Sequence, residues 1–216
     1  MSMNDTDLVT DVTNELLWDP KVDNADIVVT AVDGYVTLSG TVTSMREKRE
    51  AKKDAEHVLG VIAVDNQLQV QLDSMPTDAE LRDDVKQALL LDLLVPTTVD
   101  AEVLDGVVTL TGTADWQYQR DEAELVASNI VGTIDVFDDI ALTGLRPDAY
   151  DVQKSIKDAF KRNAALDSDG LTVITSNGTV TLDGTVSSWA EHDEALDAAW
   201  SAPGVTSVED NIAVSY

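Results

Sequence analysis

Apolar and polar residues follow one another along this chain in an order that occurs three times. Each unit opens with apolar residues three or four positions apart, which would lie along one side of a helix: Leu8, Val12, Leu16 and Leu17, then Leu81, Val85 and Leu89, then Val152, Ile156 and Phe160. A stretch with apolar residues at every second position follows, as in a strand with one buried face: Ile27, Val29 and Ala31, then Val99, Ala101 and Val103, then Leu171 and Val173. Each unit is therefore predicted to begin with a helix and a strand.

A nine-residue motif follows that strand in every unit, at Asp33–Thr41, Asp105–Thr113 and Asn177–Thr185, with the copies 72 positions apart. A fixed period of this length indicates a triplicated domain. The opening Asp-Gly or Asn-Gly is typical of a hairpin turn, because both central residues of a type I′ turn need positive φ. The Val and Leu of the motif are predicted to be buried in the returning strand. Its second glycine is expected to end that strand with a bulge or a close backbone approach.

A second helix comes next, and its buried face is expected to consist mainly of small residues: Ala51, Ala55 and Val58, then Ala123, Ala127 and Ile130, then Ala195, Ala199 and Ala202. The first and third copies start with capping-box spacing, at Ser44 with Glu47 and at Ser188 with Glu191, whereas Asp115 stands near this position in the second. A glycine ends each helix, as expected for a left-handed cap: Gly60, Gly132 and Gly204.

The last strand of each unit, at 62–70, 134–142 and 208–214, carries one polar residue where its alternation predicts an apolar one. These residues are Asn66, Asp138 and Asp210. Two interpretations are open: the side chain stabilises a bend or bulge in the strand, or it faces a bound cation.

The order of elements predicts an α+β protein of three αββαβ domains, at residues 1–73, 77–143 and 147–216. Each domain is expected to form a three-stranded mixed sheet with two helices packed on one face. The linkers are short and polar with one proline each, which favours rigid adjacency of the domains over free tumbling.

Composition narrows the possible partners. The chain has a net charge of −27, and the three units carry −8, −12 and −7, so no unit offers the cationic footprint of a nucleic-acid partner. The acidity fits solubility, adaptation to high salt, or a cation-binding surface. Cys is absent, which excludes disulfides and thiolate metal sites. The acidic N-terminus and the lack of a long apolar run predict a cytosolic protein, or a periplasmic one if a leader has been removed.

The repeated motif, the αββαβ order and the closing strands Val64–Val70, Val136–Leu142 and Val208–Val214 resemble the BON domain, named for bacterial osmotically inducible and nodulation proteins. The resemblance covers nearly the whole chain as three tandem copies. It implies a bacterial, non-enzymatic protein of envelope or stress physiology, whose domains bind phospholipid or protein. A cytosolic member with one such domain senses potassium, so the resemblance also implies an ion-responsive alternative.

The first unit contains a dense group of basic residues at the start of its second helix: Arg46, Lys48, Arg49, Lys52 and Lys53. No other unit repeats it at the same position, and we treat it as the only concentrated positive charge of the chain. It would attract lipid headgroups, because each cation near an anionic surface contributes roughly 1 kcal/mol. The interspersed Glu47, Glu50 and Asp54 support the other interpretation, a solvated helix face with internal ion pairs.

Trp116 and Trp189 stand at the entrance of the second helix in units two and three, where the rings would anchor a membrane or pack against a neighbouring unit. His57 and His192 have no second histidine at ligand spacing, and no nucleophile, phosphate loop or catalytic triad can be assembled. We therefore expect no catalytic residue, no cofactor and no metal site.

The sequence supports three hypotheses. The first is a non-enzymatic bacterial stress or envelope protein that binds a phospholipid membrane surface or an envelope protein. The second is a cytosolic module that responds to K⁺ or a divalent cation through Asn66, Asp138 and Asp210. The third is a scaffold that assembles into a homo-oligomer.

Overall fold

The computed structural model describes residues 4–72, 74–143, 149–163 and 170–215. The boundaries predicted at residues 1, 73, 147 and 216 lie outside the described residues. The first repeat consists of α1 (Asp5–Trp18), the short 3-10 helix η1 (Asn24–Asp26), β1 (Ile27–Val32), β2 (Tyr35–Val42), α2 (Met45–Glu56) and β3 (Ala63–Val70). The second consists of α3 (Asp78–Leu91), β4 (Asp100–Leu104), β5 (Val107–Ala114), α4 (Gln117–Ser128) and β6 (Asp135–Leu142). The third consists of α5 (Ala149–Arg162), β7 (Leu171–Ser176), β8 (Thr179–Val186), α6 (Trp189–Trp200) and β9 (Ser207–Val214).

Each repeat forms its own three-stranded sheet, in which the second strand along the chain lies at the centre. The strand orders are β1-β2-β3, β4-β5-β6 and β7-β8-β9. In the first repeat β2 is antiparallel to β1, where Val29 pairs with Leu38, and parallel to β3, where Leu38 pairs with Asn66. The third repeat has the same register, with Val173 opposite Leu182. A parallel pair needs a crossover connection, which α2 and α6 supply. The predicted α+β class and mixed sheets are confirmed.

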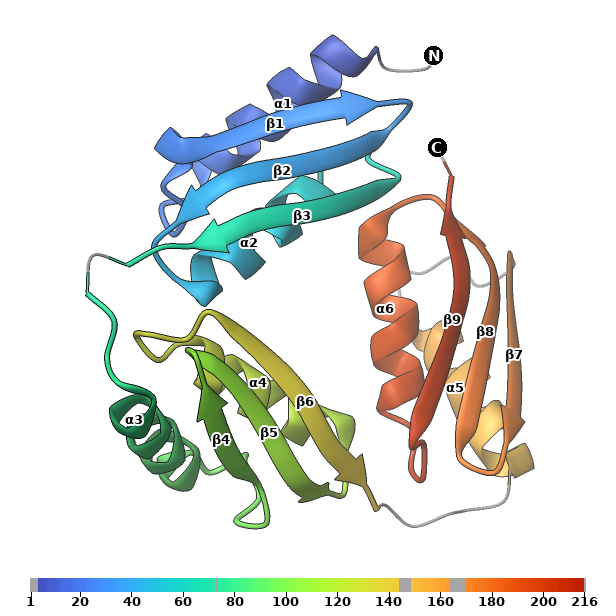
Figure 1. Ribbon diagram of the computed structural model, residues 1–216. Coiled ribbons are helices and arrows are strands. Elements are labelled where there is room, and N and C mark those ends of the chain that lie inside the picture. Colours follow the sequence, from blue (N-terminus) through green and yellow to red (C-terminus); the bar gives the residue numbers. More distant parts are fainter. Residues whose placement is uncertain (1–3, 73, 144–148, 164–169, 216) are drawn as a thin grey trace. The chain divides into compact units, whose positions relative to one another are not determined.

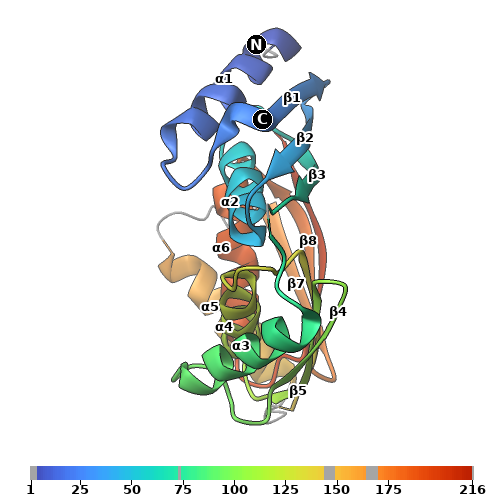
Figure 2. The same cartoon turned by 60° about the vertical axis from the view of Figure 1, so that its left-hand side comes forward.

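Both helices of a repeat cover one face of its sheet, as Figures 1 and 2 show for α1 and α2 against β1–β3. The buried cluster of the first repeat contains Leu8, Val12, Leu16, Val22, Val36, Leu38, Val42, Ala51, Ala55, Val58, Val61 and Leu68. A fully buried Val or Leu contributes about 1.5–3 kcal/mol relative to exposure, so this cluster is the main stabilising feature. Leu17 was predicted to join the apolar stripe of α1, but it is exposed, because Leu16 occupies the inward position and the next residue lies about 100° around the helix.

The Asp-Gly turn between the first two strands has the predicted conformation. Asp33 and Gly34 have φ of 51° and 85°. The turn is tied to the start of α1, because the Asp33 N–H donates to the Asp5 carboxylate at 2.9 Å. The second repeat makes the same connection, since Asp78 accepts from the N–H of Asp105 at 2.9 Å. The motif is thus a structural turn that fixes the first helix over the hairpin.

The second glycine of the motif was expected at the end of its strand, but β2 runs two residues beyond Gly40 to Val42. The close backbone approach is confirmed, because a Cβ built on Gly40 would lie 2.0 Å from the carbonyl oxygen of Asp26. Gly40 has φ of 119°, in a region that L residues rarely adopt. This glycine therefore permits close contact between β2 and the end of η1, and it does not terminate the strand.

The helix starts follow the predicted spacing, but the capping boxes predicted at the starts of α2 and α6 are only half formed. In α6, Ser188 accepts from the Glu191 N–H, while the Glu191 carboxylate accepts from the Ser187 N–H at 2.7 Å. Thr77 and Glu80 form a full capping box at the start of α3. At the start of α2, Ser44 accepts from the Glu47 N–H, but the Glu47 carboxylate does not return to Ser44 and instead accepts from the Thr43 N–H at 2.7 Å. The predicted box is therefore only half formed, and Glu47 stabilises the segment that precedes the helix.

Candidate functional site

The basic group predicted from the sequence lies on α2, whose inward face is made of Ala51 and Ala55. Because these alanines are buried, the basic side chains point away from the sheet. Arg46, Arg49 and Lys53 follow one another at three- and four-residue intervals and form an outward stripe, while Lys48 and Lys52 lie along one flank. Of these, Arg49 is half-buried and its guanidinium pairs with Glu124 of α4 at 3.0 Å. The segment therefore presents five of the six Lys and Arg residues found in positions 1–73 on one short helix.

The acidic residues interspersed on α2 were expected to neutralise this group, and most of them have other partners. Glu47 is only 5% exposed and accepts from the N–H of Asp23 at 2.7 Å. Glu50 pairs with Lys21, which precedes η1, at 2.6 Å. Lys52 does pair with Glu56 on the same helix at 3.4 Å. The internal ion pairing of the helix face is thus partial, and Glu47 and Glu50 are directed elsewhere.

The ionisation of Asp54 on α2 is altered by its surroundings. Burial raises the pKa of Asp54 to about 6, and the nearby carboxylates of Asp19, Glu50 and Glu15 act in the same direction, while Lys21 opposes them. One of its carboxylate oxygens is buried and has no hydrogen-bond partner. The proton is therefore held to a higher pH than on an ordinary aspartate.

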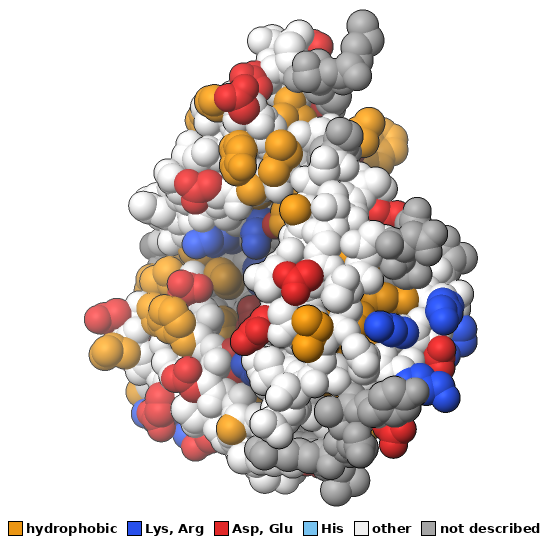
Figure 3. All heavy atoms as spheres, turned by 90° about the vertical axis from the view of Figure 1, so that its right-hand side faces the viewer, with side chains coloured by type: hydrophobic (Ala, Val, Ile, Leu, Met, Phe, Trp, Pro, Cys, Tyr) orange, Lys and Arg blue, Asp and Glu red, His pale blue; other side chains and the backbone are white. Residues whose placement is uncertain are grey.

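A second basic face lies on α5 of the third repeat, which corrects the expectation that α2 alone concentrates positive charge. Lys154, Lys157 and Lys161 are exposed at three- and four-residue intervals, and Arg162 follows them. The spacing alone could have revealed this stripe. In Figure 3 the Lys and Arg side chains of one face of the molecule stand in small groups among acidic and apolar ones. The positive charge is therefore local, within a strongly acidic protein.

The two predicted tryptophans lie at the start of α4 and α6. Trp116 is 38% exposed and its backbone N–H donates to the Gln119 side chain at 3.1 Å. Trp189 is half-buried, and its ring meets the imidazole of His192 edge-on with the centroids 4.7 Å apart. The ring of Trp189 thus packs inside its own repeat, and the lipid-anchor role of both residues stays a prediction.

The three polar strand residues occupy the same position in three different sheets. Asn66 on β3 donates from Nδ2 to the carbonyl oxygen of Lys48 at 2.8 Å and accepts from the Leu68 N–H at 3.2 Å. Asp210 on β9 likewise accepts from the Ile212 N–H at 3.0 Å. Asp138 has the equivalent place on β6. These bonds hold the polar side chain within its own repeat, and β3 and β9 pair with β2 and β8 in an unbroken register that shows no bulge. The cation-binding role of these residues stays a prediction.

His192 is the residue whose environment sequence reasoning missed. It lies on α6, is buried, and its Nε2 is 2.8 Å from Oδ2 of Asp210 on β9. Its Nδ1 is 3.5 Å from Oδ1 of Asp193, at the outer limit of a hydrogen bond. Asp193 and Asp210 both raise the pKa of His192, against the effect of burial. The 72-residue repeat contains a signal for this contact. His192 is the equivalent of Lys48 and Asp210 is the equivalent of Asn66, and Asn66 donates to the carbonyl oxygen of Lys48.

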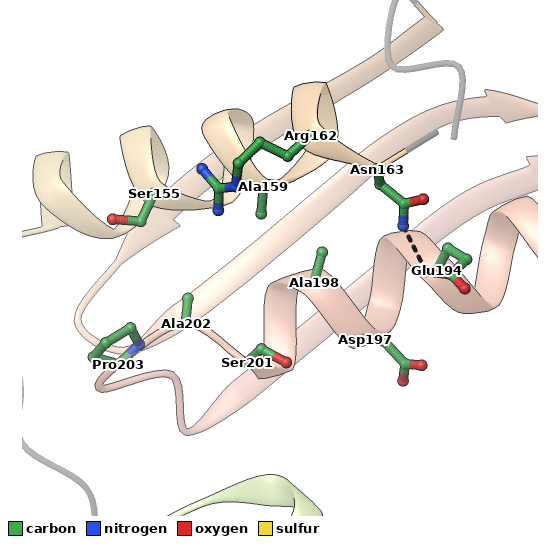
Figure 4. Close-up of a pocket in the computed structure, with 10 residues that line it drawn as sticks. All are labelled: Ser155, Ala159, Arg162, Asn163, Glu194, Asp197, Ala198, Ser201, Ala202 and Pro203. Atoms are coloured by element: carbon green, nitrogen blue, oxygen red, sulfur yellow. Dashed lines mark hydrogen bonds between the residues drawn. The ribbon is translucent and has the colours of Figure 1, made fainter. Parts of the chain in front are cut away.

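A groove runs between α5 and α6 of the third repeat and has a volume of about 430 Å³ (Figure 4). Ala159 and Ala198 face each other across it, and Asn163 donates to Glu194 at 2.5 Å at one end. Its lining consists of Ser155, Ala159, Arg162, Asn163, Glu194, Asp197, Ala198, Ser201, Ala202 and Pro203. One guanidinium and two carboxylates in a shallow groove suit a polar group better than an apolar one.

Smaller crevices recur at the carboxyl ends of the central strands, beside the start of the second helix. In the first repeat a crevice of about 280 Å³ lies beside Thr41, Thr43 and Glu47. In the second a crevice of about 310 Å³ lies beside Thr113 and Gln119, at the equivalent positions. Glu47 and Gln119 accept hydrogen bonds from the backbone just before α2 and α4. The crevices are therefore a consequence of how the chain enters the second helix in each repeat.

Within residues 4–72, 74–143, 149–163 and 170–215, no three His, Asp or Glu side chains are grouped so that they could hold a metal ion. Across the same ranges, no helix combines the length and apolar character needed to cross a bilayer.

Comparison with known proteins places these features in context. The BON domain matches the chain at residues 4–71, 77–144 and 148–216. Osmotically-inducible protein Y of Escherichia coli (strain K12) is 34% identical over 145 residues, which cover 64% of this chain and 72% of that protein. Two structures of CdsD, a structural protein of the type III secretion system of Chlamydia trachomatis, are 13% identical with TM-scores of 0.28. They cover 99% and 97% of this chain, and 100% and 92% of their own. A likeness at this level carries no argument.

Proposed function

The chain belongs to the BON domain family, and on that premise we propose that it is a non-enzymatic, stress-related protein of the bacterial envelope that binds anionic phospholipid. The stress-related part is supported by its similarity to osmotically-inducible protein Y. The binding part is supported by one observation above all, the basic outer face of α2.

The physical argument concerns local charge. Arg46 and Lys53 are exposed on the outward stripe of α2, while Glu47 is buried and Glu50 is paired with Lys21. Each cation close to an anionic bilayer contributes roughly 1 kcal/mol. The net charge of the whole chain opposes approach, but ions screen charges that lie more than about 8 Å away at physiological salt. Binding through α2 is therefore expected to be weak, oriented and sensitive to salt.

The proposal is tested by vesicle flotation with purified full-length protein. Vesicles of phosphatidylcholine are compared with vesicles that also contain phosphatidylglycerol, at low and at high salt. The wild type should float better with the anionic vesicles, and this gain should disappear at high salt. The double variant Arg46→Gln, Lys53→Gln should lose the gain. Its matched control removes two exposed charges from α5 by Lys157→Gln and Lys161→Gln and should keep most of it.

Two results would overturn the proposal. One is a wild type that shows no preference for anionic vesicles at low salt. The other is a control variant that loses as much binding as the α2 variant, because the effect would then reflect total charge and not the α2 face.

A further inference from the structure

The hairpin turn of the third repeat contains a chemically reactive pair of residues. Its motif opens with Asn177-Gly178, where the other two repeats have Asp-Gly, and no other asparagine of the chain is followed by glycine. Asn177 is exposed, and both residues have the left-handed conformation of the turn, with φ of 50° and 85°. Because glycine has no side chain, its backbone nitrogen approaches the amide carbon of a preceding asparagine more easily than that of a larger residue. The pair therefore has the composition that favours an intramolecular reaction.

The second repeat shows how the fold restrains this turn. Asp78, the first residue of α3, accepts from the N–H of Asp105 at 2.9 Å and from the N–H of Gly106 at 3.0 Å. One carboxylate thus holds both central N–H groups. In the first repeat, Asp5 accepts from the N–H of Asp33 at 2.9 Å. We call Asp5 and Asp78, at the starts of α1 and α3, the turn clamps.

The third repeat has no carboxylate at the equivalent position. Asp5 and Asp78 each stand three residues before the first buried residue of their helix. The same count back from Val152, the equivalent buried residue of α5, gives Ala149. An alanine side chain accepts no hydrogen bond, so position 149 cannot clamp the N–H of Gly178.

The cover over the turn glycine also differs. A Cβ added to Gly106 would meet the Ile134 side chain at 2.8 Å, whereas one added to Gly178 would meet the hydroxyl of Thr206 at the same distance. Gly34 in the first repeat lies against an isoleucine as well. The Thr206 hydroxyl donates to the carbonyl oxygen of Gly178 at 3.4 Å. An apolar side chain therefore covers the glycine in two repeats, and a group that water can bond to replaces it in the third.

We propose that Asn177 is a site of spontaneous deamidation, which the surroundings of this turn permit. The backbone nitrogen of Gly178 attacks Cγ of Asn177 and gives its proton to water, a C–N bond forms, and the side-chain nitrogen leaves as ammonia. Water then opens the resulting succinimide ring. Cleavage between the Gly178 nitrogen and Cγ gives aspartate, and cleavage between that nitrogen and the backbone carbonyl carbon gives isoaspartate. Water is the only co-reactant, and nothing is oxidised or reduced.

Opening of the turn controls the rate. In the closed hairpin Ser176 pairs with Thr179, so Gly178 must leave its folded position before its nitrogen reaches Cγ of Asn177. The reaction therefore proceeds from a locally opened turn, and its rate follows the population of that state. A clamp of two hydrogen bonds to a carboxylate lowers the open population by at least about tenfold. Without a clamp at Ala149, the third turn opens more readily than the second.

The products change the third repeat in two ways. Aspartate adds a negative charge and reproduces the Asp-Gly pair that the other repeats have at Asp33 and Asp105. Isoaspartate places an additional carbon in the backbone of the turn, which disturbs the pairing of β7 with β8. The third repeat thus changes with the age of the molecule. This reaction needs no membrane, so the inference does not rest on the proposed function.

The first test follows every asparagine of the full-length protein. The protein is incubated at mildly alkaline pH, which favours loss of the glycine N–H proton, and amide loss and isoaspartate are measured by peptide mass spectrometry. Asn177 should convert faster than any other asparagine. If Asn177 reacts no faster than the exposed Asn14 and Asn129, which precede larger residues, the proposal is overturned.

Matched variants test the clamp. Asp105→Asn creates a second Asn-Gly pair under the Asp78 clamp, and the double variant Asp105→Asn, Asp78→Ala removes that clamp. In the single variant, position 105 should react at least roughly tenfold more slowly than Asn177 in the same molecule, and in the double variant at a similar rate. Conversely, Ala149→Asp should slow the reaction of Asn177 several-fold, while Ala149→Leu should not.

Two results would show that the surroundings do not select Asn177. One is a single variant in which position 105 reacts as fast as Asn177. The other is an Ala149→Asp protein that converts as fast as the wild type. Protein unfolded in urea is measured alongside, so a variant that has lost its fold is recognised by its rate. If Asp78→Ala prevents folding, the comparison of Ala149→Asp with Ala149→Leu decides.

Discussion

The Nε2 atom of His192 lies 2.8 Å from the Oδ2 atom of Asp210, and this pair joins α6 to β9 in the third repeat. The same two positions are occupied in the first repeat by Lys48 and Asn66, where an amide donates to a backbone carbonyl. The same contact between the second helix and the last strand is thus made by an amide and a backbone carbonyl in the first repeat, and by an imidazole and a carboxylate in the third. The repeats share a fold but not a response to pH.

His192 should make stability depend on pH above 6.5, the ordinary pKa of histidine. Because its pKa is raised in the folded protein, its contribution is complete below the unfolded value of 6.5 and is lost as the pH rises through the higher folded value. The variant His192→Gln should therefore lower the free energy of unfolding by roughly 1 kcal/mol at pH 5, after allowance for solvent screening, and by less at pH 9. Urea unfolding followed by tryptophan fluorescence measures both. An equal loss at the two pH values would contradict the pair.

Asp54 should act in the opposite sense to an ordinary salt-bridged carboxylate. The folded protein holds its proton up to a pH of about 6, so the wild type loses stability as the pH rises from 3.8 through 6. The variant Asp54→Asn, which is neutral throughout, should match the wild type near pH 3.5 and exceed it by about 1 kcal/mol at pH 8 after screening. Thermal unfolding over this range shows the difference. The exposed control Asp11→Asn should not reproduce this pH-dependent gain.

Gly40 should tolerate no side chain. A Cβ there would meet the carbonyl oxygen of Asp26 at 2.0 Å. Asp26 ends η1 directly before Ile27, which pairs with Gly40, so neither backbone can move without disturbing that pairing. We expect Gly40→Ala to destabilise the first repeat by about 3 kcal/mol. The comparison variant is Gly34→Asn. Position 34 has the left-handed conformation of a turn, which Asn accepts, and the nearest atom to an added Cβ belongs to the movable Ile62 side chain. We expect this variant to lose about 1 kcal/mol of unfolding free energy. Urea unfolding of the two variants should rank them in this order.

Glu47 should matter more than any other acidic residue of α2. Its buried carboxylate accepts from the N–H groups of Asp23 and Thr43, so Glu47→Ala leaves both donors without that partner and should cost about 3 kcal/mol. Glu47→Gln should cost about 1 kcal/mol, because Gln119 serves the same position in the second repeat. Glu50→Gln, which removes only an exposed ion pair, should change the unfolding free energy by less than about 0.5 kcal/mol. Similar losses for all three would contradict this account.

Much of the fold was predictable because its signals are local. The Asp33-Gly34 turn follows from a dipeptide that accepts positive φ, and the buried positions Val36 and Leu38 follow from alternation along a strand. The error at Gly40 shows the limit of such signals. The close contact of Gly40 is with Asp26 at the end of η1. In the sequence, a glycine that ends a strand cannot be distinguished from a glycine that lies against another segment of backbone.

The candidate sites were less predictable. The basic group on α2 was visible as five cations in eight residues, but its interspersed acids suggested neutralisation. That Glu50 pairs with Lys21 depends on contact between two segments 29 residues apart. Leu90, Leu91 and Leu93 stand in a run of apolar residues, yet only their exposure in the structure distinguishes them from core residues.

The sequence by itself determined that three αββαβ units follow one another, the order of their helices and strands, and most of the residues that fill the core. It could do so because helix periodicity, strand alternation and turn conformation act over a few neighbouring residues. The tertiary structure alone decided that Glu47 is buried and bonded, that the pKa of Asp54 is raised, that His192 meets Asp210, and that Leu93 meets solvent. These properties depend on burial and on partners distant in the chain, which no local pattern specifies.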